Sequence, residues 1–188
     1  MDMITAIQGR RSVRSYAPEK LDEKTIRHLL EAAVLAPTAI HEEPWAVVVL
    51  QDPDILKRIS DRAEASFTED ARRLYHERGR RHPDRFSNED FSIFYDAGTL
   101  IVICGKTPGK FVAADCWLAA ENLMLAAHSM GLGTCVIGSA VQPLNAPDIK
   151  AELGIAEEMT VHVPVIVGVP FEIPSPTSRK PPEILFWK

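Results

Sequence analysis

The chain has 188 residues, the length of one ordinary domain, so we expect a single hydrophobic core. Hydrophobic residues make up 46% and charged residues 25%, which is typical of a soluble globular protein and argues against a disordered chain, a collagen-like fibre or a coiled coil. The formal net charge of -5 disfavours a dedicated nucleic-acid-binding protein, although a local basic patch stays open.

Neither a signal peptide nor a membrane span is predicted. The first four residues, Met-Asp-Met-Ile, lack the basic region that begins a signal peptide. The most apolar stretch, residues 116–127, contains Glu121 and Asn122 and is shorter than the ~20 residues that cross a bilayer. We therefore expect a cytoplasmic protein without a membrane partner.

The cysteines and histidines predict neither a disulfide framework nor a metal site. The cysteines are scattered and form no C-x-x-C pair, so we expect small buried hydrophobic residues at Cys104, Cys116 and Cys135. The six histidines show no H-x-x-x-H or H-E-x-x-H spacing. His128 and His162 stand in apolar segments and are interpreted as structural side chains.

The first clear elements along the chain are a helix and a strand. Asp22 can cap an amphipathic helix that Pro37 ends. Apolar residues recur along it at helical spacing, at Ile26, Leu29, Leu30 and Ala33. Residues 45–50 form a continuous apolar run with three valines, which predicts a buried strand.

Residues 57–90 are dense in charge, with nine basic and eight acidic side chains. The basic ones crowd into residues 72–85. A solvated helical excursion is the favoured interpretation. A basic lip that attracts a phosphate-bearing substrate, or a nucleic-acid surface, stays open as an alternative.

Strands and helices alternate in the second half of the chain. Strands are expected at residues 100–104, 134–137 and 161–167, and a short helix at 148–153 that Gly154 ends. This order of elements indicates a mixed α and β domain.

Residues 115–130 predict a helix that Gly131 would end. Its surface is apolar nearly all round, so it must be covered on most sides. A single chain of this length has few places to cover such a helix, which makes a subunit interface a natural partner.

The C-terminal part of the chain predicts an arm. Residues 164–182 carry six prolines, which block helix and central strand and favour an extended surface segment. The arm nevertheless ends in Ile-Leu-Phe-Trp at residues 184–187, which is too apolar for a free tail. We expect it to dock on another surface, such as a second subunit.

Known nucleotide and nucleophile motifs are absent from the sequence. Residues 131–138, Gly-Leu-Gly-Thr-Cys-Val-Ile-Gly, have Val136 where a dinucleotide fingerprint needs its third glycine. They also follow a predicted helix and enter a strand, the reverse of the required context. Neither a Walker A motif nor a G-x-S-x-G elbow occurs.

Two basic clusters stand at opposite ends of the chain. Residues 10–14, Arg-Arg-Ser-Val-Arg, combine three guanidiniums with a hydroxyl, a donor set suited to phosphate. Residues 178–180, Ser-Arg-Lys, lie in the proline-rich arm. The two clusters could converge on one anion, and a solvated basic turn is the alternative for the first.

Four stretches of the chain form a common pattern. Residues 10–16 match R-R-S-x-R-x-F/Y, and residues 36–45 resemble A-P-S-x-x-N-x-Q-P-W. Residues 131–138 match G-L-G-x-x-x-x-G, and residues 168–170 with 179–181 match G-x-P…R-K-P. In this order and spacing, over essentially the whole chain, they resemble the FMN-dependent nitroreductase family.

The resemblance implies a site for FMN. Arg10, Arg11 and Ser12 would hold the FMN phosphate, joined by Arg179 from the C-terminal arm. Arg14 would lie near the pyrimidine side of the flavin, where a cation stabilises the negative charge that develops on reduction.

The resemblance also implies contacts with the flavin ring. Residues of the other subunit would approach it, namely Pro37, Thr38, Ala39 and His41. Ile137 and Gly138 would lie near the ring, where a missing side chain permits close backbone approach. The family often has Asn and Gln where this chain has His41 and Glu43, a difference that bears on substrate preference.

The implied fold is α+β, a three-layer α/β/α arrangement with a mainly antiparallel central sheet in an interlocked homodimer. Residues 1–188 would form one FMN-binding domain, with a variable helical excursion at 57–90 and an arm at 170–188 that crosses to the partner subunit.

The implied activity is that of an FMN-dependent oxidoreductase. NADH or NADPH would be the transient donor, and a nitroaromatic, a quinone or a similar small molecule the acceptor. We expect no catalytic side chain, since solvent can supply protons. A same-fold dehydrogenase, dehalogenase or flavin-processing enzyme, or a flavin-storage protein, is the alternative.

Overall fold

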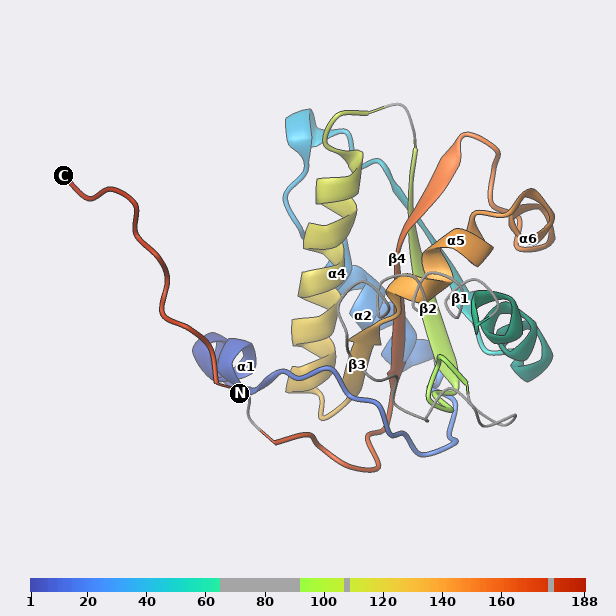
Figure 1. Cartoon of the computed structure of the whole chain (residues 1–188), viewed down its shortest axis with the longest axis horizontal. Helices are drawn as coiled ribbons and strands as arrows, with labels where there is room; N and C mark the ends of the chain where they lie inside the picture. The colour runs from blue at the N-terminus through green and yellow to red at the C-terminus, as the bar shows by residue number, and fades with distance from the viewer. Residues whose placement is uncertain (65–91, 107–108, 176–177) are drawn as a thin grey trace, which may run out of the picture.

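The computed structural model describes residues 1–64, 92–106, 109–175 and 178–188. Its centre is an antiparallel sheet of four strands in the order β1-β2-β4-β3 (Figure 1). The strands are β1 (Trp45–Leu50), β2 (Thr99–Lys106), β3 (Gly133–Val136) and β4 (Met159–Gly168).

Helices cover both faces of this sheet, which gives three layers (Figure 1). One face carries α2 (Glu23–Ala33) and α4 (Val112–Ser129). The other carries α5 (Val141–Leu144), α6 (Pro147–Glu152) and a helix through residues 53–64. The α+β fold with an antiparallel central sheet is therefore confirmed.

Side-chain alternation along β2 divides the buried residues into two cores. Leu100, Val102 and Cys104 point to the face of α5 and α6, whereas Ile101 and Ile103 point to α2 and α4. All five are at most 1% exposed. The three cysteines of the chain are all buried, as expected.

β4 corrects the interpretation of the prolines. Residues 164–182 predict an extended surface segment, but Pro164 lies inside this central strand, close to a register shift that leaves His162 unpaired with β2. The Pro164 carbonyl accepts a hydrogen bond from the N–H of Ile137, just past the end of β3. Because the N–H and C=O of one residue point to the same side of a strand, the missing N–H of Pro164 takes no bond from the β2–β4 ladder.

β1 is an edge strand rather than the buried strand that its apolar run predicts. Within the described residues it has one neighbour, β2. Of its side chains only Leu50 is buried, and Val49 is 37% exposed. A continuous apolar run implies cover on both faces, and the described residues of one protomer supply that cover incompletely.

Capping residues explain where the helices begin and end. The Asp22 carboxylate caps α2, as expected. α4 begins at Val112, three residues earlier than predicted, and Gly131 follows its end with a φ of +80°. A further helix that the sequence pattern did not predict, α1 (Met3–Gly9), is capped by Asp2. Among the helices of the described ranges, none has the length and apolarity to cross a membrane.

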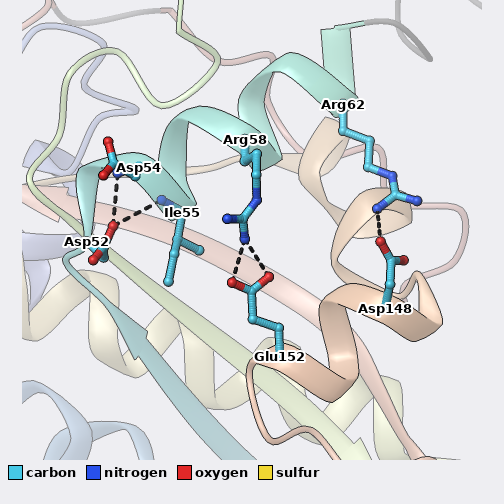
Figure 2. A network of polar contacts seen from close by, with 7 residues as sticks. All are labelled: Asp52, Asp54, Ile55, Arg58, Arg62, Asp148 and Glu152. Atoms are coloured by element: carbon cyan, nitrogen blue, oxygen red, sulfur yellow. Dashed lines mark hydrogen bonds and ion pairs between the residues drawn. The ribbon is translucent and has the colours of Figure 1, made fainter.

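Ion pairs hold the helix through residues 53–64 against α6 (Figure 2). Arg58 pairs with Glu152, and one turn later Arg62 Nη1 lies 2.6 Å from an Asp148 carboxylate oxygen. Both pairs are largely solvent-exposed, so they orient the two helices more than they stabilise the fold.

The charged segment of residues 57–90 is described only in its first part. Residues 57–64 belong to the helix held by these ion pairs. Residues 65–91 lie outside the described residues, and with them the basic stretch at 72–85. The basic lip and the nucleic-acid surface therefore stay untested predictions.

Candidate functional site

The segment that follows α1 lies along the outer edge of β3. Ser12 pairs with Thr134 in a parallel bridge, and the N–H of Val13 donates to the Thr134 carbonyl at 2.9 Å. Further on, Tyr16 pairs with Pro170, and its hydroxyl donates to the Val13 carbonyl at 2.9 Å. These bonds fix the backbone on which three arginines stand.

Two glycines before and within β3 make room for this segment. A Cβ atom on Gly133 would lie 2.8 Å from Cγ2 of Val13, closer than side chains pack. The positive φ of Gly131 turns the chain from α4 into β3. The Gly-Leu-Gly sequence therefore seats the arginine segment against the sheet.

The arginine side chains present donors that the protein leaves largely unused. Arg11 Nη1 donates to the carbonyls of Gln8 at 2.6 Å and Arg10 at 2.7 Å, but its buried Nε has no partner among the described residues. Arg10 Nε lies 3.6 Å from a Glu121 oxygen. Arg14 is exposed, and its Nη1 makes one long contact of 3.5 Å to a backbone carbonyl. Because buried N–H groups without an acceptor are rare, this cluster is suited to bind an anion.

Cys135 of β3 lies beneath the arginine cluster. Burial raises the pKa of its thiol, while Arg14, Ser12 and Arg10 act in the opposite direction by favouring the thiolate. Arg14, Ser12 and Arg10 therefore act on the same thiol of β3.

The chain beyond β3 offers an open backbone surface. Ile137 is buried, and Gly138 begins η3 (Gly138–Ala140) at the surface. A Cβ atom on Gly138 would meet no atom within 4 Å. Ile137 and Gly138 follow Thr134, the residue that pairs with Ser12, by three and four residues, so both predicted residues stand just past the part of β3 that carries the arginine segment.

The turn of residues 37–43 has an unusual backbone. It contains η1 (Ala39–His41). Three of its non-glycine residues have positive φ, namely Ile40 at 48°, His41 at 57° and Glu43 at 45°. Such conformations persist only where the surroundings hold them, and they are frequent in functional loops.

This turn and the arginine cluster lie at different levels of α4 (Figure 1). The N–H of Ala39 donates to the Asp115 carboxylate, near the start of α4. Arg10 contacts Glu121, six residues further and about 9 Å along the helix. Within one protomer the structure therefore places the predicted ring-side residues apart from the arginines, these residues being Pro37, Thr38, Ala39 and His41.

The C-terminal arm, residues 178–188, extends away from the body of the protomer (Figure 1). Arg179 lies on it, exposed, and no hydrogen bond or ion pair to a described residue fixes its guanidinium. Near the end of the arm Phe186 is 80% and Trp187 84% exposed. Among the described residues of one protomer, nothing therefore fixes Arg179 beside the other arginines.

The outer face of α4 is apolar and open to solvent. Trp117 is 49% and Leu118 45% exposed on this face. The opposite face packs on the sheet and on α2. The helix is thus apolar on both sides, as expected, and the described protomer covers one of them.

Sequence reasoning missed the roles of two carboxylates on α4. In the sequence Glu121 only interrupts an apolar stretch and so argues against a membrane span, whereas in the structure it pairs with Arg10. Asp115 marked only the expected start of the helix, yet it is buried and contacts the 37–43 turn. The available signal was the cost of burying a carboxylate in an apolar helix, which demands a hydrogen-bond donor nearby.

The chain matches known proteins over most of its length. The model of the nitroreductase family matches residues 7–168. A Methanothermobacter thermautotrophicus protein, provisionally named NADH dehydrogenase/NAD(P)H nitroreductase, is 30% identical over 181 residues, or 93% of this chain and 80% of that one. An iodotyrosine deiodinase of Thermotoga neapolitana is 24% identical over 171 residues, or 86% of this chain and 84% of that one.

A solved structure shares the fold. The crystal structure of a Bacteroides fragilis nitroreductase with bound FMN has a TM-score of 0.83 at 24% identity, and the match covers 100% of both chains. The family model, the relative from M. thermautotrophicus and this shared fold agree with one another. This chain belongs to the nitroreductase family.

Proposed function

We propose that this chain is an FMN-dependent oxidoreductase that takes electrons from NADH or NADPH and delivers them to a small acceptor, such as a nitroaromatic or a quinone. The observation that carries the proposal is the arginine cluster along β3, with its buried and unpartnered Arg11 Nε. Membership of the nitroreductase family and the FMN bound by the B. fragilis protein support it.

The donors of this cluster fit a phosphate group. Arg10, Arg11 and Ser12 would hold the FMN phosphate, since two guanidiniums and a hydroxyl supply charge and directed donors. A carboxylate oxygen of Glu121, 3.6 Å from Arg10 Nε, orients Arg10 and leaves the charges of Arg11 and Arg14 without an ion-pair partner among the described residues. Arg179 would join from the C-terminal arm, which leaves its guanidinium exposed and uncommitted in one protomer.

Arg14 would act on the redox chemistry rather than on binding. When bound, FMN supplies the hydride and electron transfer chemistry that no side chain of this site provides. A guanidinium beside the ring stabilises the negative charge that reduction adds, and only such a differential interaction shifts a redox equilibrium. Arg14 suits this role because it is exposed and held by one long contact.

The working unit would be a homodimer. The described residues leave three apolar surfaces exposed or half-covered: the outer face of α4, the edge strand β1 and the end of the arm. A second copy covers such surfaces with the same surfaces of its own. In that assembly the partner would supply the turn of residues 37–43 to the ring, while Ile137 and Gly138 line it from the same protomer.

The absorbance spectrum of the purified protein tests the proposal. We expect a yellow protein that loses its visible absorbance under anaerobic conditions with NADH or NADPH and regains it with a nitroaromatic or quinone. A colourless protein that binds neither FMN nor riboflavin would overturn the proposal. A yellow protein that neither donor bleaches would instead indicate flavin storage.

Reductive dehalogenation is the second candidate, favoured by the similarity to the T. neapolitana iodotyrosine deiodinase. The discriminating experiment reduces the flavin anaerobically and then adds iodotyrosine or a nitroaromatic in separate samples. Reoxidation with release of iodide by iodotyrosine alone would select this candidate. Reoxidation by the nitroaromatic alone would exclude it.

A further inference from the structure

Asp115 is a buried carboxylate that the proposed function does not use. It lies on the inner side of α4 and is 4% exposed. Both carboxylate oxygens accept from the same backbone N–H, that of Ala39, at 3.3 and 3.4 Å. No cation pairs with it among the residues that the structure describes. Its place in the first turn of α4 favours a carboxylate through the helix dipole, but among the described residues its one hydrogen-bond donor is the Ala39 N–H. The role of this carboxylate outside α4 is therefore its bond to Ala39.

Asn122 is a second polar side chain on α4, and it contacts the last turn of α2, just before the connection to β1. Its Nδ2 donates to the Ala32 carbonyl at 3.2 Å, close to the end of α2. Asp115 and Asn122 are seven residues apart, which places them on one face of the helix two turns apart. Their backbone partners, Ala32 and Ala39, are also seven residues apart, so α4 holds the chain once at the end of α2 and once within the connection to β1.

The stretch beyond Ala39 is the one that needs holding. Ile40, His41 and Glu43 all have positive φ, which side chains disfavour and a β-branched residue disfavours most. On the far side the Pro44 carbonyl accepts from the N–H of Lys106 at 2.9 Å. The residues with positive φ therefore lie between two fixed points. One is the bond of Pro44 to β2, and the other is the bond of Ala39 to Asp115.

We propose that Asp115 is a positioning residue, which sets the place of the Ala39–His41 turn by accepting the Ala39 N–H and thereby shapes the ring side of the flavin site. The role of the turn rests on the proposed function, whereas the hydrogen bond does not. Asp115 is too deeply buried to serve as a ligand of flavin or substrate itself.

The first experiment measures amide hydrogen exchange in the flavin-free protein. Asp115→Ala removes the acceptor and keeps a strong helix former. We expect peptides covering residues 38–43 to exchange about tenfold faster, the factor for one lost hydrogen bond to a charged acceptor, while the sheet exchanges as in the wild type. Asp115→Asn keeps an acceptor oxygen of the same reach and should retain the protection.

Asn122→Ala is the matched control. It removes the other anchor on the same helix face, at the α2 end of the connection. We expect faster exchange near the end of α2 and unchanged exchange at residues 38–43. Equal acceleration at 38–43 in Asn122→Ala and Asp115→Ala would overturn a specific role for Asp115.

The second experiment measures flavin affinity and the visible circular dichroism of bound flavin. Because the turn would face the ring and not the phosphate, Asp115→Ala should weaken FMN and riboflavin by the same factor and alter the dichroism, and Asp115→Asn should restore both. A variant that loses stability throughout, with unchanged dichroism per bound flavin, would reduce Asp115 to a structural residue.

The two experiments separate this inference from the proposed function. If the wild-type protein binds no flavin, the proposed function fails, and the exchange experiment still decides whether Asp115 holds the turn. If flavin binds and the exchange at residues 38–43 is the same in Asp115→Ala as in the wild type, the proposed function stands and the positioning role is wrong.

Discussion

The two ends of the chain differ in how they meet the fold. The segment of residues 10–17 is bonded along its backbone to β3 and to the residues after β4. The arm of residues 178–188 carries Arg179 and a row of large apolar side chains, all of them exposed. The backbone of the N-terminal segment finds its partners among the described residues of its own chain. The large side chains of the arm find no cover there.

The N-terminal segment therefore packs against its own chain, whereas the arm would need a second copy of the chain to cover its apolar side chains. Tyr16 and Val13 are buried because β3, β4 and Gly133 provide their seats. Phe186 and Trp187 have no such seat among the described residues. An arm this apolar is a cost in a monomer and a gain in a dimer.

Deleting residues 184–188 should have the largest effect, because it removes the apolar end of the arm. Four large apolar side chains would be lost, each stabilising a buried contact by ~1.5–3 kcal/mol. We expect dimer dissociation in sedimentation experiments and a matching loss of bound flavin. A truncated protein that remains a dimer with full flavin content would show that the arm is not part of the interface.

Gly133→Ala probes the seat of the other end. Its Cβ would collide with Val13, which is short, branched and fixed by its backbone, so we expect a loss of about 1–3 kcal/mol in the free energy of unfolding. Adding Val13→Ala should recover much of this loss.

Gly138→Ala serves as the control for that substitution, because a Cβ there meets nothing within 4 Å. The flavin-free control should unfold like the wild type. If Gly133→Ala does so too, the Gly-Leu-Gly sequence does not seat the arginine segment.

Arg14→Gln tests whether the arginines of residues 10–14 have different roles. We expect the variant to keep FMN and to show a midpoint potential lower by about 30 mV, which is ~1.4 kcal/mol for a two-electron couple. Spectroscopic titration against a reference dye measures it. Loss of FMN with an unchanged potential of the bound fraction would make Arg14 a phosphate ligand.

His162 gives the smallest expected effect and belongs to neither end. Burial lowers the pKa of this imidazole below its ordinary value of 6.5, so the unfolded state takes up the proton first. Stability is then full above pH 6.5 and declines as the pH falls through that value towards the folded pKa. His162→Phe should reduce the difference between urea unfolding at about pH 8 and about pH 5. An unchanged difference would assign the acid sensitivity to other groups.

Much of the fold could be predicted from local pattern. α2 follows from its spacing and its cap at Asp22, and α4 from its apolar surface and Gly131. The position of Pro164 could not be predicted, because a proline is excluded from a central strand only where its N–H would be needed for a ladder hydrogen bond. Whether it is needed depends on which neighbouring strand faces the proline, here the residue just past the end of β3. The edge position of β1 could not be predicted, because an apolar run indicates that the strand is covered but not whether its own chain or another one covers it.

The candidate site could be predicted in part. The composition of the arginine segment marks it as a candidate site, and the structure places this segment along the edge of β3. The positive φ values at Ile40 and His41 carry no signal in residue type, since neither is a glycine. The bond from Ala39 to Asp115 joins residues 76 apart, and only the packing of α4 makes it visible.

A calorimetric titration of flavin-free protein tests most directly whether the arginine cluster binds the FMN phosphate. The two ligands are FMN and riboflavin, which lacks the phosphate. Arg11→Gln should lose ~1.5–3 kcal/mol in FMN affinity and leave riboflavin affinity unchanged, because the positively charged guanidinium of Arg11 would serve the phosphate. Arg27→Gln, an exposed arginine on α2 paired with Glu23, should change neither. Equal weakening of FMN and riboflavin by Arg11→Gln, or no weakening at all, would contradict the assignment of the arginine cluster to the cofactor phosphate.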